Sequence, residues 1–517
     1  MRIVTNVAAI VANNALQKSQ NNLSTSIERL SSGYKINGSK DDAAGCAISE
    51  KMRAQIRGLS QAQNNTADGV SVLNTAEGAI TEIQSMLTRL KELSVQAAND
   101  VNSDDEREAI QKEIEQINNE IDRISDQTEF NTQSLINGNL SRRVYSDLQG
   151  VNQLSVSDSY TAGVYGITVT EDARQAIAIG AGSITMSSTA SITEEQAGAI
   201  NINGYKISIS EGDTLDKVMG KIIDGVNITG GSAFTVKDLN NDTAANGTDY
   251  AGYVPTADYA GSTLVIMTNQ YGSDQKMNIT CDNAELADIL GIPQAATQDG
   301  IYVEGSDVKA EIATGDDGKR IGFADSAILS TKGTVITVTD VNNKEFSMDV
   351  PGNAAGTVFD DSNNDGQSVA GAGAGTARTI SQEVTDVGTM SIHVGANQDQ
   401  VIVIDIPAIT TYSLGTEHMN VMTQYTASRA ISTVDEAINK TNKIRSRIGA
   451  YENRFDHTTN NLEVSSENLT KSLSTMIDTD MSEEMTTYTS ETVLTQAATS
   501  ILAQANERPS QVLQLLQ

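Results

Sequence analysis

The chain has 517 residues and a formal net charge of -32, because 67 Asp and Glu residues stand against only 35 Lys and Arg residues. That balance excludes nucleic acid as a partner, since binding phosphates requires cationic side chains. No apolar run approaches the roughly 18 residues that span a bilayer, so we expect no membrane insertion. Residues 3–12 lack a basic cluster and a cleavage site, so we expect no cleaved signal peptide.

The N-terminal part of the chain is predicted to be helical. Residues 2–30 carry leucines spaced by seven, and the Ser, Gly and Asn residues that follow end this first helix. A second helix is predicted over residues 43–98, which Gly58 and Gly69 could interrupt. Both helices are amphipathic and therefore need a partner to cover their apolar faces.

The next helix has an N-terminal signal of its own. Ser103 and Glu106 form a capping-box pattern, in which each side chain bonds the backbone N–H of the other residue, so a helix is predicted from there to about Ser125. This helix and the one before it would form an antiparallel hairpin. Long helices resume at Val421 and reach the C-terminus, with a break predicted near residues 479–482.

Apolar residues recur three and four apart, or seven apart, in three seams. Such a repeat places the apolar side chains on one stripe of a helix, and another helix must cover that stripe. The seams consist of Leu73, Ala76, Ile80, Ile83, Leu87 and Leu90, of Ile110, Ile114, Ile117, Ile121 and Ile124, and of Ile448, Phe455, Leu462, Leu469 and Met476. Two seams lie near one end of the chain and one near the other, so we predict that the two ends cover each other in a helical bundle.

The middle of the chain has a different pattern. Apolar and polar residues alternate there in short runs, which is typical of strands. Strands are predicted at 206–210, 334–339 and 346–350, and short helices at 215–223 and 284–290. We therefore predict a multidomain fold, with mainly α N- and C-terminal regions in a coiled-coil or helical-bundle core and a central β-rich α+β insert. The insert would contain two small subdomains, at about 178–292 and 293–390.

No catalytic, cofactor-binding or metal-binding set can be assembled from the motifs. Three histidines occur singly, at His393, His418 and His457, with no HExxH, GxSxG or CxxC pattern around them. Residues 361–366 begin like a calcium loop, but Ala372 stands where the bidentate Glu should be, so a solvated acidic turn is favoured. Residues 371–375 lack the Lys and Ser or Thr of a phosphate loop and are interpreted as a flexible loop.

The two cysteines, Cys46 and Cys281, are too few for a disulfide framework and lie far apart in the sequence, so we predict no bridge between them. Cys46 stands among alanines. We interpret it as a small buried apolar residue, with a reactive thiol as the alternative.

Ordered segments at both ends of the chain closely resemble bacterial flagellin. They are Met1 to Ile3, Thr5 to Ala9, Leu30 to Asn37, Asp41 to Gly45, Ala47 to Met52, Glu92 to Leu93, Val95 to Asn99, Glu120 to Ile124 and Phe130 to Asn131, and then His393 to Asn397, Ile404 to Pro407, Asn460 to Leu462, Leu502 to Asn506 and Val512 to Leu516. Val4, Cys46 and Ser94 depart from the family's usual residues. The resemblance covers roughly residues 1–177 and 391–517. In the middle, Ile202 to Leu215 resembles the small insert, named for its Ile-Asn signature, of flagellins and hook-associated proteins.

The resemblance implies a structural subunit that polymerises into the bacterial flagellar filament for motility and is no enzyme. Residues 1–44 and 473–517 would form the inner tube of the filament. Residues 45–177 and 391–472 would form a helical-bundle core with a β-hairpin portion, and 178–390 would be a surface-exposed variable insert. The apolar stripes are too extensive for one hairpin to cover, so we expect packing between copies. The residues expected there are Leu16, Leu23, Leu30, Ile80, Ile83, Leu87, Leu90, Ile448, Phe455, Leu462, Leu469, Leu502, Leu513 and Leu516.

The resemblance also implies partners and a location. The subunit would be exported unfolded through the flagellar type III channel, bound beforehand by an export chaperone on its C-terminal helices, and assembled at the filament tip in the extracellular flagellum. The filament cap and the hook-associated proteins would be further partners. In animal hosts, a Toll-like receptor for flagellin would recognise Arg89, Leu93 and Glu113. No cofactor is implied.

Two other functions are compatible with parts of the sequence. A hook–filament junction protein would share the helical termini, although such proteins lack the full set of motifs above. A secreted enzyme displayed through the central insert is the other alternative, and a hydrolase assay on assembled filaments would distinguish it.

Overall fold

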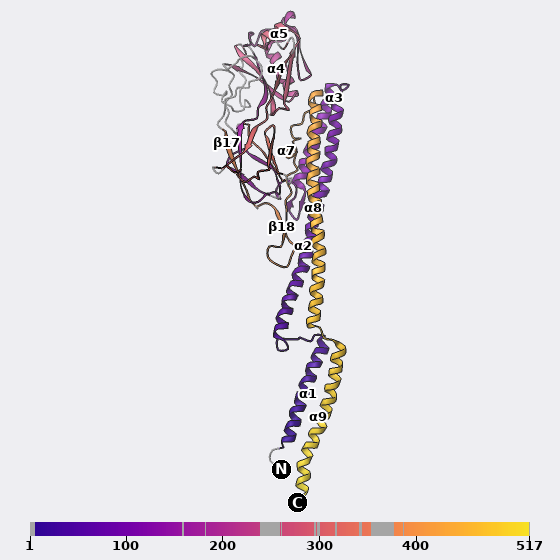
Figure 1. Cartoon of the computed structure of the whole chain (residues 1–517). Helices are drawn as coiled ribbons and strands as arrows, with labels where there is room; N and C mark the ends of the chain where they lie inside the picture. Colours follow the sequence, from indigo (N-terminus) through magenta and orange to yellow (C-terminus); the bar gives the residue numbers. More distant parts are fainter. Residues whose placement is uncertain are drawn as a thin grey trace. The chain divides into compact units, whose positions relative to one another are not determined.

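The computed structural model describes residues 6–157, 160–180, 182–237, 259, 261–293, 296, 300–315, 318–340, 344–352, 377–385 and 387–515, with the side chains of 236–237 and 509–515 left out. The chain forms two compact units (Figure 1). The terminal unit consists of Met1–Val70, Ile392–Ile402 and Asn453–Gln517. The central unit consists of Ser71–Ser391 and Val403–Glu452.

Helices from opposite ends of the sequence pair in the terminal unit. α1 (Val7–Ser32) begins at the N-cap Asn6, whose side chain accepts a backbone hydrogen bond at 3.1 Å, and ends at Gly33, whose φ of +77° favours glycine. α9 (Met481–Leu515) lies beside α1 (Figure 1). The preceding helix ends at Ile477 and α9 begins at Met481, so the break predicted near residues 479–482 is confirmed.

Two long helices contribute to both units. α2 (Ala43–Ala97) has 55 residues and α8 (Gln424–Ile477) has 54. The predicted interruptions of α2 are wrong, because the helix is continuous through Gly58 and Gly69. A Cβ atom at these positions would come within 3.0 and 3.1 Å of residues packed against the helix. These two glycines therefore allow close approach and do not end the helix.

One of the three predicted seams is confirmed in full as core of the helical bundle, and the other two are confirmed in part, because Ile117, Ile124, Leu469 and Met476 are only half-buried. Every residue of the seam from Leu73 to Leu90 is fully buried. α3 (Asp104–Gln127) follows α2 and opens with the predicted capping box, in which the Glu106 carboxylate accepts the backbone N–H of Ser103 at 2.8 Å. A short helix, α7 (Thr411–Leu414), precedes α8.

The first β cluster, part of the central unit, is an α+β fold with its own core. Two antiparallel sheets, in the orders β12-β11-β7-β8 and β6-β10-β9, share one apolar core with α4 (Leu215–Ile228) and α5 (Ala284–Ile289), which confirms both predicted short helices. A 3-10 turn, η1 (Glu194–Gln196), precedes β7. The strands are β6 (Gln175–Ile179), β7 (Gly198–Ile202), β8 (Tyr205–Ile209), β9 (Gly231–Lys237), β10 (Ser262–Tyr271), β11 (Lys276–Cys281) and β12 (Ile301–Glu304).

The second β cluster packs two four-stranded sheets, in the orders β13-β5-β17-β3 and β14-β15-β16-β4, around buried aromatic rings. The rings of Tyr165 and Phe323 lie 5.1 Å apart, edge to face. The strands are β3 (Val144–Ser146), β4 (Asn152–Val156), β5 (Gly163–Glu171), β13 (Lys309–Ile312), β14 (Ile328–Lys332), β15 (Val335–Thr339), β16 (Glu345–Asp349) and β17 (Arg378–Val384). The strands predicted at 334–339 and 346–350 are confirmed as β15 and β16, which pair antiparallel. Residues 341–343 between them lie outside the described part.

Strand pairing crosses the predicted domain boundaries. Residues 144–171 supply strands that pair with strands from 309–384, so the first β cluster is inserted into the second. The boundary predicted at 178 therefore separates strands that the structure pairs.

Two small hairpins complete the fold. They are β1 (Glu129–Phe130) with β2 (Gln133–Ser134), and β18 (Met390–His393) with β19 (Val401–Ile404). Together these elements confirm the predicted fold class of helical terminal regions with a central β-rich insert.

Candidate functional site

Polar contacts join α1 to α9. The Ser19 hydroxyl donates to Glu491 at 2.6 Å, and the Ser26 hydroxyl donates to Glu484 at 2.5 Å. Residues further along α1 thus meet residues earlier on α9, so the helices run antiparallel. Ser26 and Glu484 are both buried, and Arg29 adds an ion pair to Glu484 at 3.7 Å.

The same contacts affect the charge state of α9. Hydrogen bonds from Ser19 and then from Asn22 hold the pKa of Glu491 below its ordinary value. The carboxylate therefore stays ionised at neutral pH and keeps accepting both bonds.

The buried stripe of α1 alternates leucines with small residues. Ala12, Ser19 and Ser26 are buried and lie seven apart. The predicted packing residues Leu16, Leu23 and Leu30 lie between them and are half-buried. Reasoning from the sequence missed the serines because they are polar, although their spacing by seven matches that of Glu484 and Glu491.

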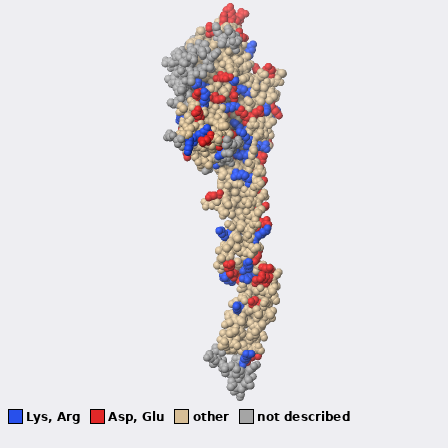
Figure 2. All heavy atoms as spheres, viewed as in Figure 1, with Lys and Arg blue, Asp and Glu red and all other residues tan. Residues whose placement is uncertain are grey.

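The outer faces of α1 and α9 carry few charges and several large exposed apolar side chains. Figure 2 shows few charged side chains over these two helices on the face drawn. The large apolar side chains left in water, each at least 49% exposed, are Val7, Ile10, Val11 and Ile27 on α1 and Met481, Met485, Val493, Leu494 and Ile501 on α9. Val7, Ile10 and Val11 lie within about one turn of α1, and an exposed apolar cluster is typical of a site of interaction with another protein surface.

Several residues predicted to pack between copies are instead covered by the chain itself. Ile80, Ile83, Leu87, Leu90, Ile448, Phe455 and Leu462 are each at most 6% exposed. They hold the helical bundle of one subunit together, because neighbouring helices of the same chain already occupy their stripe. Leu469 and Leu502 are half-buried. The side chains of Leu513 and Leu516 lie outside the described part of the chain.

Arg89 and Glu113, two of the residues expected to contact a host receptor, lie together on the surface. The Arg89 guanidinium, on α2, donates from Nη2 and Nε to Glu113, on α3, at 2.9 and 3.1 Å. It also donates to Glu92 at 3.1 Å. These bonds, from Glu113 first and then Glu92, raise the pKa of Arg89. The pair offers a fixed charged surface to a partner.

Leu93, the third of these residues, is not on that surface. Its side chain is 1% exposed, so in the folded monomer it does not offer an apolar contact beside Arg89. Four residues turn an α-helix by about 40° beyond one full circle. That rotation carries Leu93 onto the buried stripe of Leu90 and Ala97.

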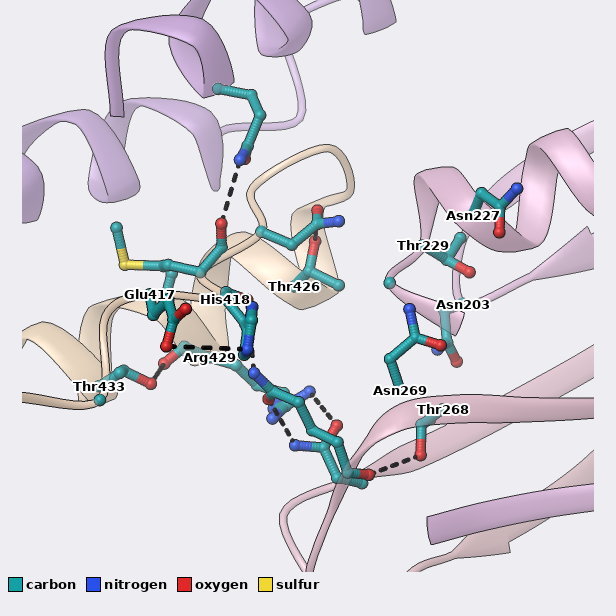
Figure 3. A pocket seen from close by; sticks show the side chains of 18 of the residues that line it. Asn203, Asn227, Thr229, Thr268, Asn269, Glu417, His418, Thr426, Arg429 and Thr433 are labelled. Atoms are coloured by element: carbon teal, nitrogen blue, oxygen red, sulfur yellow. Dashed lines mark hydrogen bonds and ion pairs between the residues drawn. The ribbon is translucent and has the colours of Figure 1, made fainter. Parts of the chain in front are cut away.

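A polar cavity of about 440 Å³ lies in the central unit, between α3 and α8 on one side and the first β cluster on the other. In Figure 3, Asn203, Asn227 and Asn269 come from the β cluster, and Thr426 and Arg429 from the opposite wall. Arg429 donates to Gln275 at 3.1 Å across the gap. The lining offers both hydrogen-bond donors and hydrogen-bond acceptors, which suits bound water better than an apolar ligand.

In the described residues, no three His, Cys, Asp or Glu side chains are grouped to hold a metal ion. The calcium-like segment 361–366 and the glycine loop 371–375 fall outside the described part. Both cysteines are free: Cys46 is half-buried, while Cys281 is buried, which raises the pKa of its thiol. Among the described helices, none combines the length and apolar character needed to cross a bilayer.

Comparison with known proteins identifies the family. Residues 3–141 match the model of the bacterial flagellin N-terminal helical region, and residues 431–516 match that of the C-terminal helical region. The chain is 31% identical over 539 residues to flagellin of Salmonella typhimurium, with 99% of each protein covered. It is 30% identical over 517 residues to polar flagellin A of Vibrio parahaemolyticus, with 100% of this chain and 99% of that protein covered.

A solved structure, flagellar hook associated protein-3 from Legionella pneumophila, is similar over 83% of this chain and 98% of that chain at 13% identity, with a TM-score of 0.28. A TM-score this low supports no conclusion, so the family rests on the sequence relatives. Since two terminal models and full-length relatives at 30 and 31% identity agree, the chain belongs to the bacterial flagellins.

Proposed function

We propose that copies of this flagellin, a structural subunit of the flagellar filament, join through the apolar outer faces of α1 and α9. In this arrangement residues 1–44 and 473–517 form the inner tube of the filament. Residues 45–177 and 391–472 surround that tube, and residues 178–390 face the medium. We infer a structural role without catalysis from the family, so a clear hydrolase activity of assembled filaments would contradict it.

The observation that carries the proposal is the contrast between the two sides of the α1–α9 pair. Inside the pair, the fully buried apolar side chains of the described residues are Ala12 and Ala505, and the remaining buried contacts are polar. Outside, nine large apolar side chains remain in water. Each is 49–63% exposed, so burying the rest of it contributes only about half of the roughly 1.5–3 kcal/mol of a full burial. Contact with neighbouring copies would thus stabilise these helices more than their own pairing does.

The weak internal core of this pair also favours order that depends on neighbours. Helices that bury little apolar surface on their own are marginally stable and become fully ordered only when a partner covers them. We infer export in an unfolded state through the flagellar type III channel and assembly at the tip of the extracellular filament. We also infer an export chaperone that covers α9 beforehand, and contacts with the filament cap and the hook-associated proteins at the two ends of the polymer.

Charge substitutions on the outer face test the proposal. Val11→Asp and Ile501→Asp should each abolish filaments in sedimentation and electron-microscopy assays, while the monomer keeps its helical circular dichroism. Tyr302→Asp is the matched control, because Tyr302 is 54% exposed but belongs to the first β cluster. Normal filaments from both α1 and α9 variants would sink the proposed interface.

A deletion pair tests the division between tube and insert. Replacing residues 181–390 by a short Gly/Ser linker should leave polymerisation intact, whereas removing residues 506–517 should abolish it. The reverse ranking would contradict the assignment of the insert to the surface. The full-length flagellin relatives do not favour the hook–filament junction protein or the displayed enzyme.

A further inference from the structure

One face of α8 carries charged side chains that bond the β clusters. Arg429, Glu436 and Lys443 lie seven apart, so they form one stripe along the helix. Arg429 donates to Gln275 of the first β cluster at 3.1 Å. Lys443 pairs with Glu345 of the second β cluster at 3.0 Å. We call these three α8 residues the polar stripe.

The middle residue of the polar stripe makes a further ion pair, and outside the stripe the Asn420 amide donates to Ile228 of the first β cluster at 2.9 Å. Glu436 pairs with Lys332 on β14 of the second β cluster, and Lys332 also lies 3.3 Å from Asp274. The side chains of Lys332 and Glu436 are half exposed, and that of Lys443 is 67% exposed. Dissolved ions can therefore reach these pairs and screen them.

The opposite face of α8 has the reverse character. Ala427, Val434 and Thr441 are fully buried in the helical bundle and also lie seven apart. The polar stripe is displaced from them by two positions, which is about 200° around the helix. α8 thus turns a buried face to the other helices and a polar face to the β clusters.

The apolar cores of the two β clusters are separate from the long helices of the bundle. Among the described residues, the two cores and the apolar residues packed against them include none from α2, α3 or α8. The polar cavity of Figure 3 occupies part of the same boundary. Apolar burial therefore stabilises each cluster internally but does not fasten it to the bundle.

The backbone connects the β clusters to the helical bundle covalently where the chain enters them near Arg143 and leaves them near Val387, and hydrogen bonds join these two segments. We call this connection the tether. There, Arg143 donates its backbone N–H to Val387 at 2.9 Å, and Thr385 donates to Arg143 at 3.1 Å. We propose that the polar stripe is a salt-sensitive joint, which releases the β clusters from α8 about this tether while the helical bundle stays folded.

A distance measurement on the full-length monomer tests the joint. Donor and acceptor dyes are placed at Ser208→Cys on β8 and Asp105→Cys at the start of α3, in a Cys46→Ser, Cys281→Ala background. The neighbouring Asp104 is close enough to Tyr205 to affect its pKa, so the two labelled segments lie near each other in the docked state. Single-molecule energy transfer is recorded from about 0.01 M to about 1 M NaCl, over which the Debye length falls from about 30 to about 3 Å.

The expected result is one high-transfer population at low salt and a growing low-transfer population at high salt, with unchanged helical circular dichroism. Lys443→Glu should shift the midpoint to lower salt, and the exchanged pair Lys443→Glu with Glu345→Lys should restore it. Lys309→Glu is the control, because Lys309 pairs with Glu171 within the second β cluster at 2.8 Å. Constant transfer at all salt concentrations in every variant, or loss of helical signal together with opening, would overturn the joint.

Discussion

Ser26 and Glu484 lie 458 positions apart in the sequence, yet the serine hydroxyl donates to the carboxylate at 2.5 Å in the buried seam between α1 and α9. Arg29, one helical turn further on, pairs with the same carboxylate. Glu484 of the C-terminal helix thus accepts a hydrogen bond from Ser26 and forms an ion pair with Arg29, both on the N-terminal helix. Glu484 is therefore central to the pairing of the two chain ends.

Glu484→Ala should loosen the α1–α9 pair. A buried hydrogen bond to a charged group contributes about 1.5–3 kcal/mol, and its loss would also leave the Ser26 hydroxyl without its acceptor. We expect faster amide hydrogen exchange along α1 in the monomer. Glu483→Ala is the control, since the neighbouring Glu483 is exposed. Identical exchange in the two variants would remove Glu484 from this role.

Asp213 should make the stability of the first β cluster depend on acid pH. Its carboxylate accepts bonds from Lys221 at 2.6 Å and from the backbone N–H of Ser210 at 3.1 Å, which lower its pKa to about 2. A folded pKa below the unfolded one stabilises the fold fully above about pH 4, and this contribution is lost as the pH falls toward 2. The urea midpoints of wild type and Asp213→Asn should therefore differ most at neutral pH and converge near pH 2.

Asp224→Asn serves as the control for that experiment, because Asp224 is an exposed carboxylate on α4, the helix that follows Asp213. A gap between wild type and Asp213→Asn that stays constant with pH would contradict the assignment.

Two glycines of α2 should respond oppositely to alanine. A Cβ atom at Gly78 meets nothing within 4 Å, so Gly78→Ala should raise the free energy of unfolding by up to about 1 kcal/mol through helix propensity. At Gly58, a Cβ atom would lie 3.0 Å from the Ala396 Cβ, so Gly58→Ala should gain less or lose stability. Urea unfolding monitored by circular dichroism compares the two. Equal gains would show that close packing at Gly58 is unimportant.

Host-receptor binding should depend on Arg89 in the monomer. Arginine is favoured at binding hot spots, so Arg89→Ala should weaken binding of the receptor ectodomain by about tenfold or more, about 1.4 kcal/mol. Arg123→Ala is the control, because Arg123 is an exposed arginine of α3 with a similar carboxylate partner, Glu120. Polymerised filament should bind less well than monomer. Equal affinity of wild type and Arg89→Ala in surface plasmon resonance would exclude Arg89 from the contact.

Local patterns in the sequence predicted the helices because helix formation and capping depend on nearby residues. Ser103 and Glu106 specify a helix start within four residues, and the seam from Leu73 to Leu90 specifies its buried face. The buried serines of α1 escaped prediction because hydropathy ignores a polar side chain whose partner is far away in the sequence. Ser19 becomes recognisable only when Glu491 is placed opposite it.

Non-local contacts account for the other errors. Strand β5 pairs with β13 and β17, which lie more than a hundred residues later, so no local signal could place residues 163–171 in the second β cluster. The exposure of Leu93 likewise depends on a small rotation around the helix axis and on the helices that cover it. The polar stripe of α8 has a sequence period, but a period alone does not reveal that β clusters lie against it.

The pairing of the chain ends has a consequence for synthesis. A ribosome releases α1 first, but Glu491 is made 472 residues after its partner Ser19. At about 5–20 residues per second, α1 waits on the order of a minute without the helix that it pairs with. Both β clusters, whose strands are complete by residue 384, can fold during that wait. Any factor that must keep the whole chain unfolded therefore has to act on the middle of the chain before its C-terminus exists.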